Sequence, residues 1–264
     1  MTFRFSDTSL DPYLRFFAPK MSPYTTAVAD GTVRVVGELA DIDHLLVETT
    51  VDKLQLKLFD YPAANEGPIQ LALNRHVVEV KRFRLVGEGP ALEVSGTVGL
   101  HDNRIALDAA GDANLGILQA FYREIRSSGN ASLQAQMRGP LDNPVFSGNA
   151  AIASGRIRYF SLPHSLQDIN ARLDFDAQGI RIVDAVAQLG GGPVKFGGRI
   201  GLDGYQIGTI DLTATGEQMS LRYPEGFRSV IDAALTLRGD PASLVLGGNV
   251  TLRDGIYSKR FEPN

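Results

Sequence analysis

The chain has 264 residues, of which 28 are glycine and 13 are proline, and it contains neither cysteine nor tryptophan. Its 26 basic and 30 acidic residues give a net charge of −4. The lack of cysteine excludes disulfides, thiolate nucleophiles and cysteine-ligated metals. The lack of a basic excess argues against nucleic-acid binding, and glycine at about one residue in nine argues against a mainly helical protein.

The two ends of the chain suggest a piece of a longer protein. No stretch approaches the ~20 apolar residues that a membrane span requires. Residues 1–7 lack the basic region and apolar run of a signal peptide, and residues 260–264 suggest a truncated end. We expect either a cytoplasmic protein or a fragment whose targeting segment lies elsewhere.

Helical spacing of apolar residues appears only twice. Ser9 can cap a short helix that ends before Pro19, and Asn114 can cap a second one that starts at Leu115 and has Gly129 just past its end. We therefore expect one or two short helices at the borders of larger segments.

Alternation of apolar and polar residues, which is typical of strands, dominates the rest of the chain. It occurs in residues 54–58, 69–73, 133–137, 157–159, 171–175, 180–182, 194–196 and 233–237. Turn signals separate these segments, at residues 30–31, 87–90, 101–103, 143–144, 178–179, 190–193, 203–204 and 254–255. Because successive side chains of a strand point to opposite faces, each segment has one apolar and one polar face. The pattern predicts an all-β fold.

Glycines recur at a spacing of about 100 residues, which indicates an internal repeat. The matched pairs are Gly96/Gly198, Gly139/Gly239, Gly148/Gly248 and Gly155/Gly255. We interpret these glycines as turn corners and divide the chain into repeat 1 (1–113, eroded at its start), repeat 2 (114–218) and a partial repeat 3 (219–264). Repeats that stack end to end form elongated proteins.

Two stretches of the chain resemble the AsmA-like/TamB family of Gram-negative envelope proteins. In residues 133–157, an alternating strand leads to a glycine, a short Asp/Asn-Pro turn, an apolar pair, a second glycine and further strands. Residues 235–257 repeat this order, with Leu244 where Pro144 stands in the first copy. The resemblance covers most of the chain and is strongest from about residue 77 onward.

This resemblance implies an elongated, folded-over β-sheet of the β-taco type, solenoid-like, with an apolar groove. It implies a fragment of the periplasmic region of a protein anchored in the inner membrane. The implied role is non-enzymatic, needs no cofactor, and consists of carrying phospholipid between the inner and outer membranes or assisting outer-membrane protein assembly. The implied partners are phospholipid acyl chains and an outer-membrane barrel protein of the TamA/BamA type.

An apolar trough suits such a role, because each methylene exposed to water costs about 0.8 kcal/mol, or on the order of 11 kcal/mol for a tail of about 14 methylenes. The residues that we expect to line the trough lie in the alternating segments and in the repeated ones: Leu56, Leu71, Val94, Leu133, Met137, Leu173, Phe175, Ile182, Phe196, Leu235 and Leu237.

Three other interpretations remain open. Alternating apolar faces also form the closed core of a β-sandwich. A β-solenoid or β-sandwich adhesin or carbohydrate-binding module would normally show aromatic platforms, whereas tryptophan is absent and aromatic residues make up only 8%. A β-rich enzyme would need an active-site cluster. We find no catalytic motif, and the four histidines lack metal-ligand spacing, so we predict no catalytic residue and no metal site.

Overall fold

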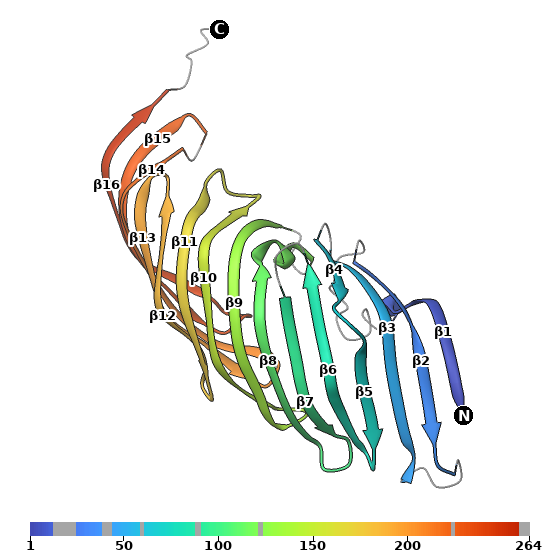
Figure 1. The fold of residues 1–264 in the computed structure, drawn as a ribbon. Helices are drawn as coiled ribbons and strands as arrows, with labels where there is room; N and C mark the ends of the chain where they lie inside the picture. Colours follow the sequence, from blue (N-terminus) through green and yellow to red (C-terminus); the bar gives the residue numbers. More distant parts are fainter. Residues whose placement is uncertain are drawn as a thin grey trace. The chain divides into compact units, whose positions relative to one another are not determined.

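A computed structural model describes residues 1–12, 25–38, 44–58, 61–87, 91–120, 124–222 and 225–258 (Figure 1). Strands make up 79% of it and helix 3%, and the strands form one antiparallel sheet of 16 strands. The strand order is β1-β2-β3-β4-β6 and then sequential to β16, with β5 also pairing with β3 and β6. The predicted fold class, an all-β repetitive sheet, is confirmed.

The strands are bounded as follows: β1 Thr2–Ser9, β2 Thr26–Val36, β3 Leu46–Leu58, β4 Tyr61–Asn65, β5 Ile69–Asn74, β6 Val77–Gly87, β7 Ala91–Gly99, β8 Arg104–Asn114, β9 Ile125–Pro140, β10 Val145–Tyr159, β11 Ser165–Asp176, β12 Gly179–Leu189, β13 Gly192–Asp203, β14 Gln206–Leu221, β15 Phe227–Gly239 and β16 Val245–Tyr257. The chain divides into two compact units. The N-terminal unit contains residues 1–123 and 131–150, and the C-terminal unit contains residues 124–130 and 151–264. The division passes through β9 and β10.

A small core holds the N-terminal unit together. Ala29, Leu54 and Ile69 form a buried cluster, against which Phe5 and Phe83 pack with other apolar side chains. Ala29 lies opposite Leu54 in the pairing of β2 with β3. Directly opposed residues on antiparallel strands point to the same face, so the sheet gathers these apolar side chains on one side.

The C-terminal unit repeats this arrangement across its strands. A row of cross-strand partners runs from Ala171 on β11 through Ala185, Phe196, Ala214 and Leu235. Because each step joins directly opposed residues, the whole row lies on one face of the sheet.

Side chains of one strand accept hydrogen bonds from backbone N–H groups of the preceding strand at several places, in each case through a carboxylate or carboxamide oxygen. Two of the donors, the N–H groups of Asp7 and Gln218, lie at shifts of register between paired strands. The pairs, named acceptor first, are Asp30/Asp7 (2.6 Å), Asn65/Leu54 (2.6 Å), Asn170/Ser154 (3.2 Å) and Asp232/Gln218 (2.8 Å). We call these side chains bulge clamps. In every pair the clamp comes from the strand that follows in the sequence.

Two predicted turns are wrong. Asp30-Gly31 lies inside β2 and Asp254-Gly255 lies inside β16. Both sites coincide with a shift of register in the pairing of the strand that carries them. Asp30 serves as a bulge clamp instead of forming a corner. A bulge and a turn use the same residue types, so composition did not separate them.

The interpretation of the repeated glycines as turn corners is correct only for Gly139 and Gly239, which stand at or next to the ends of β9 and β15. The other matched pairs lie within strands. They are Gly96/Gly198, Gly148/Gly248 and Gly155/Gly255. The repeat therefore marks equivalent positions inside the strands as well as at their ends.

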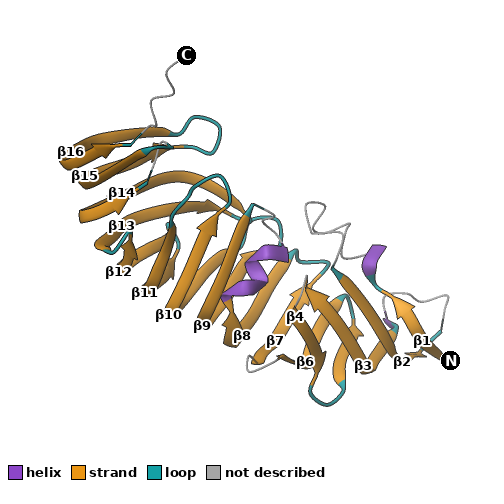
Figure 2. Cartoon of the chain, turned by 90° about the horizontal axis from the view of Figure 1, so that it is seen from above, coloured by secondary structure: helices purple, strands orange, loops and turns teal. Residues whose placement is uncertain are grey.

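The predicted second helix exists but is short. It is a 3-10 helix, η2 (Leu115–Ala120, Figure 2), and the Asn114 side chain accepts a hydrogen bond from the N–H of Gly116 at 2.8 Å. Gly129, expected just past its end, lies inside β9. Most of the helix expected after Ser9 falls outside the described residues.

Candidate functional site: the apolar face

One face of the sheet, which we call the apolar face, carries alanine, leucine, valine, isoleucine and phenylalanine in each unit. In the N-terminal unit, Leu71 lies opposite Thr49 and Val80, and Val94 lies opposite Phe83 and Ala109. In the C-terminal unit, Leu173 lies opposite Ile182, and Leu237 opposite Leu212 and Leu246. Within each unit, the apolar face extends over the strands whose pairing connects these residues.

The structure places all the residues predicted to line a trough on this face. Register pairs place most of them directly: Leu56, Leu71, Val94, Leu173, Phe175, Ile182, Phe196, Leu235 and Leu237. Leu133 and Met137 follow from alternation along β9, since neighbouring Arg138 reaches Asp108 on the opposite face. Leu56, Leu71, Val94, Leu133 and Met137 belong to the N-terminal unit and the others to the C-terminal unit.

These predicted side chains are half-buried, neither sealed from solvent nor fully exposed. Among the described residues, no large side chain is less than 2% exposed. The buried apolar residues include small ones, such as Ala29 and Ala185, and large ones, such as Leu54, Ile69 and Met219. A closed sandwich packs a second sheet onto such a layer, whereas the described strands all belong to one sheet.

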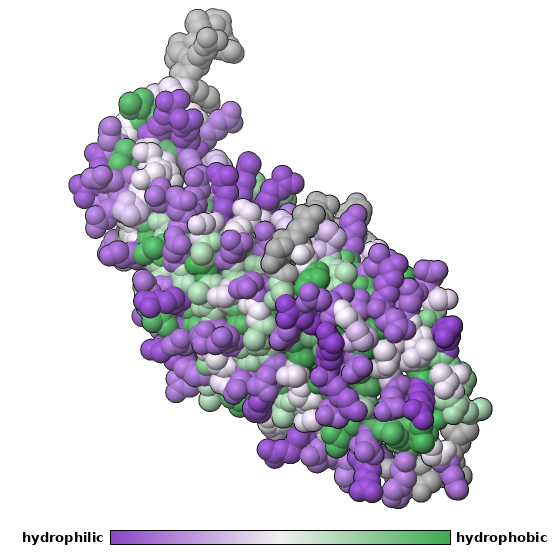
Figure 3. All heavy atoms as spheres, in the orientation of Figure 1, coloured by the Kyte–Doolittle hydropathy of each residue, from purple (hydrophilic) through white to green (hydrophobic). Residues whose placement is uncertain are grey.

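The opposite face, which we call the polar face, carries cross-strand ion pairs. Arg138 binds both carboxylate oxygens of Asp108 at 2.7 Å, and Arg84 contacts Glu66 and Glu93. Such exposed pairs contribute little to stability. They make this face hydrophilic, in contrast to the apolar face behind it. In the view of Figure 3, hydrophilic side chains cover much of the visible surface, with hydrophobic ones between them.

In the C-terminal unit, ion pairs of this kind lower the pKa of the carboxyl groups of Asp176 and Asp232. Arg199 donates hydrogen bonds to both oxygens of Asp176, and the N–H of Gln178 donates another at 2.8 Å. These donors lower the pKa of the Asp176 carboxyl below its ordinary value, chiefly through Arg199.

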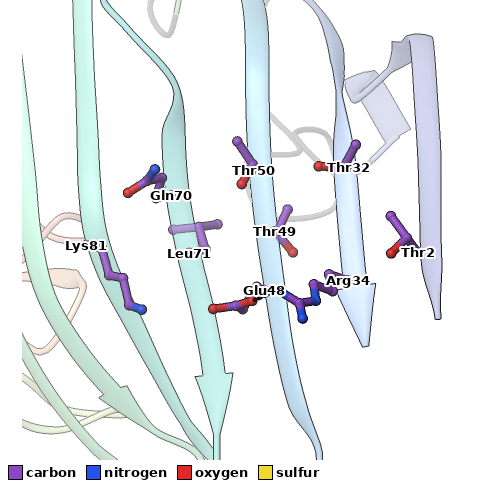
Figure 4. A pocket seen from close by; sticks show the side chains of 9 residues that line it. All are labelled: Thr2, Thr32, Arg34, Glu48, Thr49, Thr50, Gln70, Leu71 and Lys81. Carbon is purple, nitrogen blue, oxygen red and sulfur yellow. Dashed lines mark ion pairs between the residues drawn. The ribbon is translucent and has the colours of Figure 1, made fainter. Parts of the chain in front are cut away.

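Two shallow hollows lie in the N-terminal unit. Polar residues dominate the lining of the first, and the second is lined by alanine and glycine as well as by polar residues. The first, of about 320 Å³, is lined by Thr2, Thr32, Arg34, Glu48, Thr49, Thr50, Gln70, Leu71 and Lys81 (Figure 4). The second, of about 390 Å³, is lined by Glu93, Ser95, Asp108, Ala109, Ala110, Gln134, Ala135, Gln136, Gly148 and Asn149. The predicted lining residues, apart from Leu71, do not contribute to them.

No group of three or more potential ligands that could hold a metal ion occurs in the part of the chain that the structure describes. Sequence reasoning missed one neighbour relation: the rings of His76 and His101 lie 5.8 Å apart, on two adjacent hairpin turns. The two histidines are 25 residues apart in the sequence and match no metal-ligand motif, so the sequence contained no sign that their rings are neighbours.

Sequence reasoning also missed a group of residues at the last strand. Leu246, Val250 and Leu252 lie on the apolar face opposite Leu237, Ala233 and Ile231. They alternate with polar residues or glycine, so the period-two pattern could have identified them.

Comparison with known proteins adds one match. The family model of the TamB C-terminal domain matches residues 82–188 and 178–263, together more than half of the chain. No curated protein and no solved structure matches the chain. No helix among the described residues is long and apolar enough to cross a membrane.

Proposed function

Because the chain belongs to the TamB C-terminal domain family, we propose that its apolar face is a path for phospholipid acyl chains crossing the periplasm between the inner and outer membranes. The TamB family is a transport and assembly family, which supports a non-enzymatic role. The proposed site consists of the predicted lining residues together with the small residues between them.

One observation carries this proposal: large apolar side chains on the apolar face remain half-buried in both units. Phe196 and Leu235, for example, both lie opposite Ala214, which leaves room above the small side chain between them. A sheet that exposes this much apolar surface normally has a partner for it. An acyl chain is a suitable partner for this surface, because it gains from apolar contact and has no polar groups that need hydrogen-bond partners.

The magnitude of the barrier supports the same conclusion. A tail of about 14 methylenes exposed to water would cost on the order of 11 kcal/mol. Contact with leucine, isoleucine and phenylalanine side chains removes a large share of that cost, because it depends on the apolar area taken out of water. The charged polar face offers no such cover.

The proposed setting follows from the family. TamB proteins work with the outer-membrane assembly machinery. We propose a periplasmic location, a membrane anchor in the full-length protein and an outer-membrane barrel of the TamA/BamA type as the protein partner. Assistance to outer-membrane protein assembly is compatible with the same apolar face, since a transmembrane β-strand also has one apolar side.

Native mass spectrometry of the purified chain tests the proposal. We expect co-purified phospholipid on the wild-type protein and its loss in Leu173→Asp, which places a charge on the apolar face. The matched control is Thr213→Asp on the polar face, where Thr213 lies opposite Gly197 and Thr236 and is exposed. Circular dichroism must show both variants folded. Equal lipid content in the two folded variants would contradict the proposal.

A further inference from the structure

Two arginines lie directly opposite each other on the polar face, where β9 begins and β10 ends. The N–H of Phe160, just past β10, donates a hydrogen bond to the carbonyl oxygen of Glu124, just before β9, at 3.0 Å. In this antiparallel register, two residues further into each strand, Arg158 on β10 faces Arg126 on β9. Both arginines are exposed. The Cβ atoms of directly opposed residues lie about 4.5–5.5 Å apart on the same face of a sheet, so the two side chains are neighbours.

Arg126 and Arg158 differ from other arginines of the polar face because they have no carboxylate partner. None of the ion pairs between described residues includes either of them. Arg181 and Arg199 also lie opposite each other, but each of those two binds an aspartate of β11. Like charges directly opposite on neighbouring strands are destabilising. The guanidinium groups of Arg126 and Arg158 therefore repel each other unless an anion from outside the described chain binds them.

The internal repeat shows that the fold does not require these two arginines. The residues 100 positions after Arg126 and Arg158 are Gly226 and Ser258. These two residues adopt the same register, since the N–H of Ser258 donates a hydrogen bond to the carbonyl oxygen of Gly226 at 2.8 Å. The backbone pairing thus forms equally well with a glycine and a serine, which indicates that the arginines serve binding and not folding.

The loop between β10 and β11 exposes apolar side chains beside this arginine pair. Phe160 is 56% exposed and Leu162 is 51% exposed. Two hydrogen bonds hold the loop: the N–H of Leu162 donates to the carbonyl oxygen of Tyr159 at 3.0 Å, and the Nε2 atom of His164 accepts from the N–H of Arg222 at 2.6 Å. The second bond ties the loop to the end of β14. The apolar tip is therefore an ordered part of the structure.

The charge around the loop is positive, although the whole chain has a net charge of −4. Residues 124–130, 154–170 and 220–222 contain four arginines and two carboxylates, which gives +2. One of the two carboxylates, that of Glu124, accepts a hydrogen bond from the Tyr159 hydroxyl at 2.7 Å. The four arginines are Arg126, Arg156, Arg158 and Arg222. This local excess of positive charge favours an anionic partner.

We infer that this loop and its arginines bind the surface of an anionic phospholipid membrane. The guanidinium groups of Arg126 and Arg158 bind headgroup phosphates, because arginine presents paired N–H donors that match phosphate oxygens. Phe160 and Leu162 enter the boundary between the headgroups and the acyl chains. A soluble phosphate would use the arginines but not the apolar tip. The contact uses the polar face and a loop, so it does not depend on acyl-chain transport along the apolar face.

Sedimentation of the whole chain with lipid vesicles tests the inference. We expect binding to vesicles of phosphatidylglycerol and not to vesicles of phosphatidylcholine, whose headgroup has no net charge. The double variant Arg126→Gln, Arg158→Gln should weaken binding at least about 10-fold, because each arginine near an anionic surface contributes to attraction. The matched control is Arg181→Gln, Arg238→Gln, which removes the same charge from the polar face of the same unit, where both arginines bind aspartates.

The control double variant should bind almost as well as the wild type, and circular dichroism must show both double variants folded. Equal binding to the two kinds of vesicle, or an equal loss in the two double variants, would overturn the inference. The absence of vesicle binding by the wild type, as expected if the loop instead recognised an acidic protein, would overturn it as well.

A single tryptophan tests whether the tip of the loop enters the membrane. The chain contains no tryptophan, so the tryptophan emission of Phe160→Trp comes from this position alone. We expect this emission to shift to shorter wavelength when phosphatidylglycerol vesicles are added. The control is Tyr205→Trp in the turn between β13 and β14, at the opposite strand ends, where Tyr205 is 57% exposed. An unshifted emission at position 160 in vesicle-bound protein, or equal shifts at the two positions, would overturn the inference.

Discussion

Gly198 on β13 packs directly against the backbone of Asp211 on β14. Its φ of +113° lies in the left-handed region, and an added Cβ atom would come well within 3.0 Å of the Asp211 carbonyl oxygen. Gly198 lies opposite Ile182 and Leu212 on the apolar face. The glycine therefore lets the backbones of the two strands approach more closely than a side chain would allow.

Gly198→Ala should destabilise the protein strongly, by at least about 2 kcal/mol, because it adds both a positive-φ penalty and a backbone clash. The control is Gly197→Ala, one residue away. Its φ lies outside the left-handed region, and its Cβ would meet the Thr213 hydroxyl at 3.2 Å. Denaturant unfolding measures both. Equal losses in the two variants would contradict the assigned role of Gly198.

Acid should destabilise the C-terminal unit through Asp176. Hydrogen bonds from Arg199 lower its pKa in the folded state relative to the unfolded one. The unfolded state therefore binds more protons at low pH, so this stabilisation is present at neutral pH and is lost as the pH falls through the folded pKa. Asp176→Asn and Arg199→Gln should each flatten the dependence of the free energy of unfolding on pH between about 5 and 2. An unchanged slope in both variants would refute the assignment.

Asp232, a bulge clamp on β15, contacts both neighbouring strands, β14 and β16. Its carboxylate accepts from the N–H of Gln218 at 2.8 Å and contacts the guanidinium of Arg253. Asp232→Ala should lower the Tm by a few degrees because it leaves the N–H at the bulge without its acceptor. Asp232→Asn keeps an acceptor oxygen and loses the charge, so thermal unfolding should place it between the alanine variant and the wild type. A wild-type Tm for Asp232→Ala would show that the clamp does not hold the bulge.

The helix η2 depends on its capping residue. Asn114→Ala removes the acceptor for the N–H of Gly116 and should cost about 1 kcal/mol. Asn114→Asp retains a side-chain acceptor and should cost less. Denaturant unfolding of the two variants measures the difference, and an equally large loss in both would indicate that the cap is not the source of the effect.

The sequence predicted the faces of the sheet far better than its irregularities. Residues such as Leu173 and Phe196 lie on the predicted face because alternation alone determines the side to which a strand residue points. Gly198 was misjudged as a corner because a glycine with positive φ inside a strand and a glycine in a turn look alike in the sequence. Asp30 was misread as part of a turn because its actual role, accepting a hydrogen bond from the N–H of Asp7, involves a residue 23 positions away.

The predicted lining residues could be placed without knowledge of the strand order, but their exposure could not. Whether Leu235 is sealed or open depends on whether a second layer packs above it, and alternation is the same in both cases. Similarly, Leu246 and Val250 are exposed because β15 is the one strand that pairs with β16 among the described residues, and no local pattern encodes the number of neighbours of a strand.

Photo-crosslinking at two adjacent positions of β13 tests the central claim most directly. Phe196 lies half-buried on the apolar face, and Lys195 is exposed on the polar face. With benzoylphenylalanine at each position in turn, in cells of a Gram-negative bacterium, we predict phospholipid adducts at position 196 and none at position 195. Absence of lipid adducts at position 196 in a folded protein, or equal adducts at both positions, would contradict a lipid path along the apolar face.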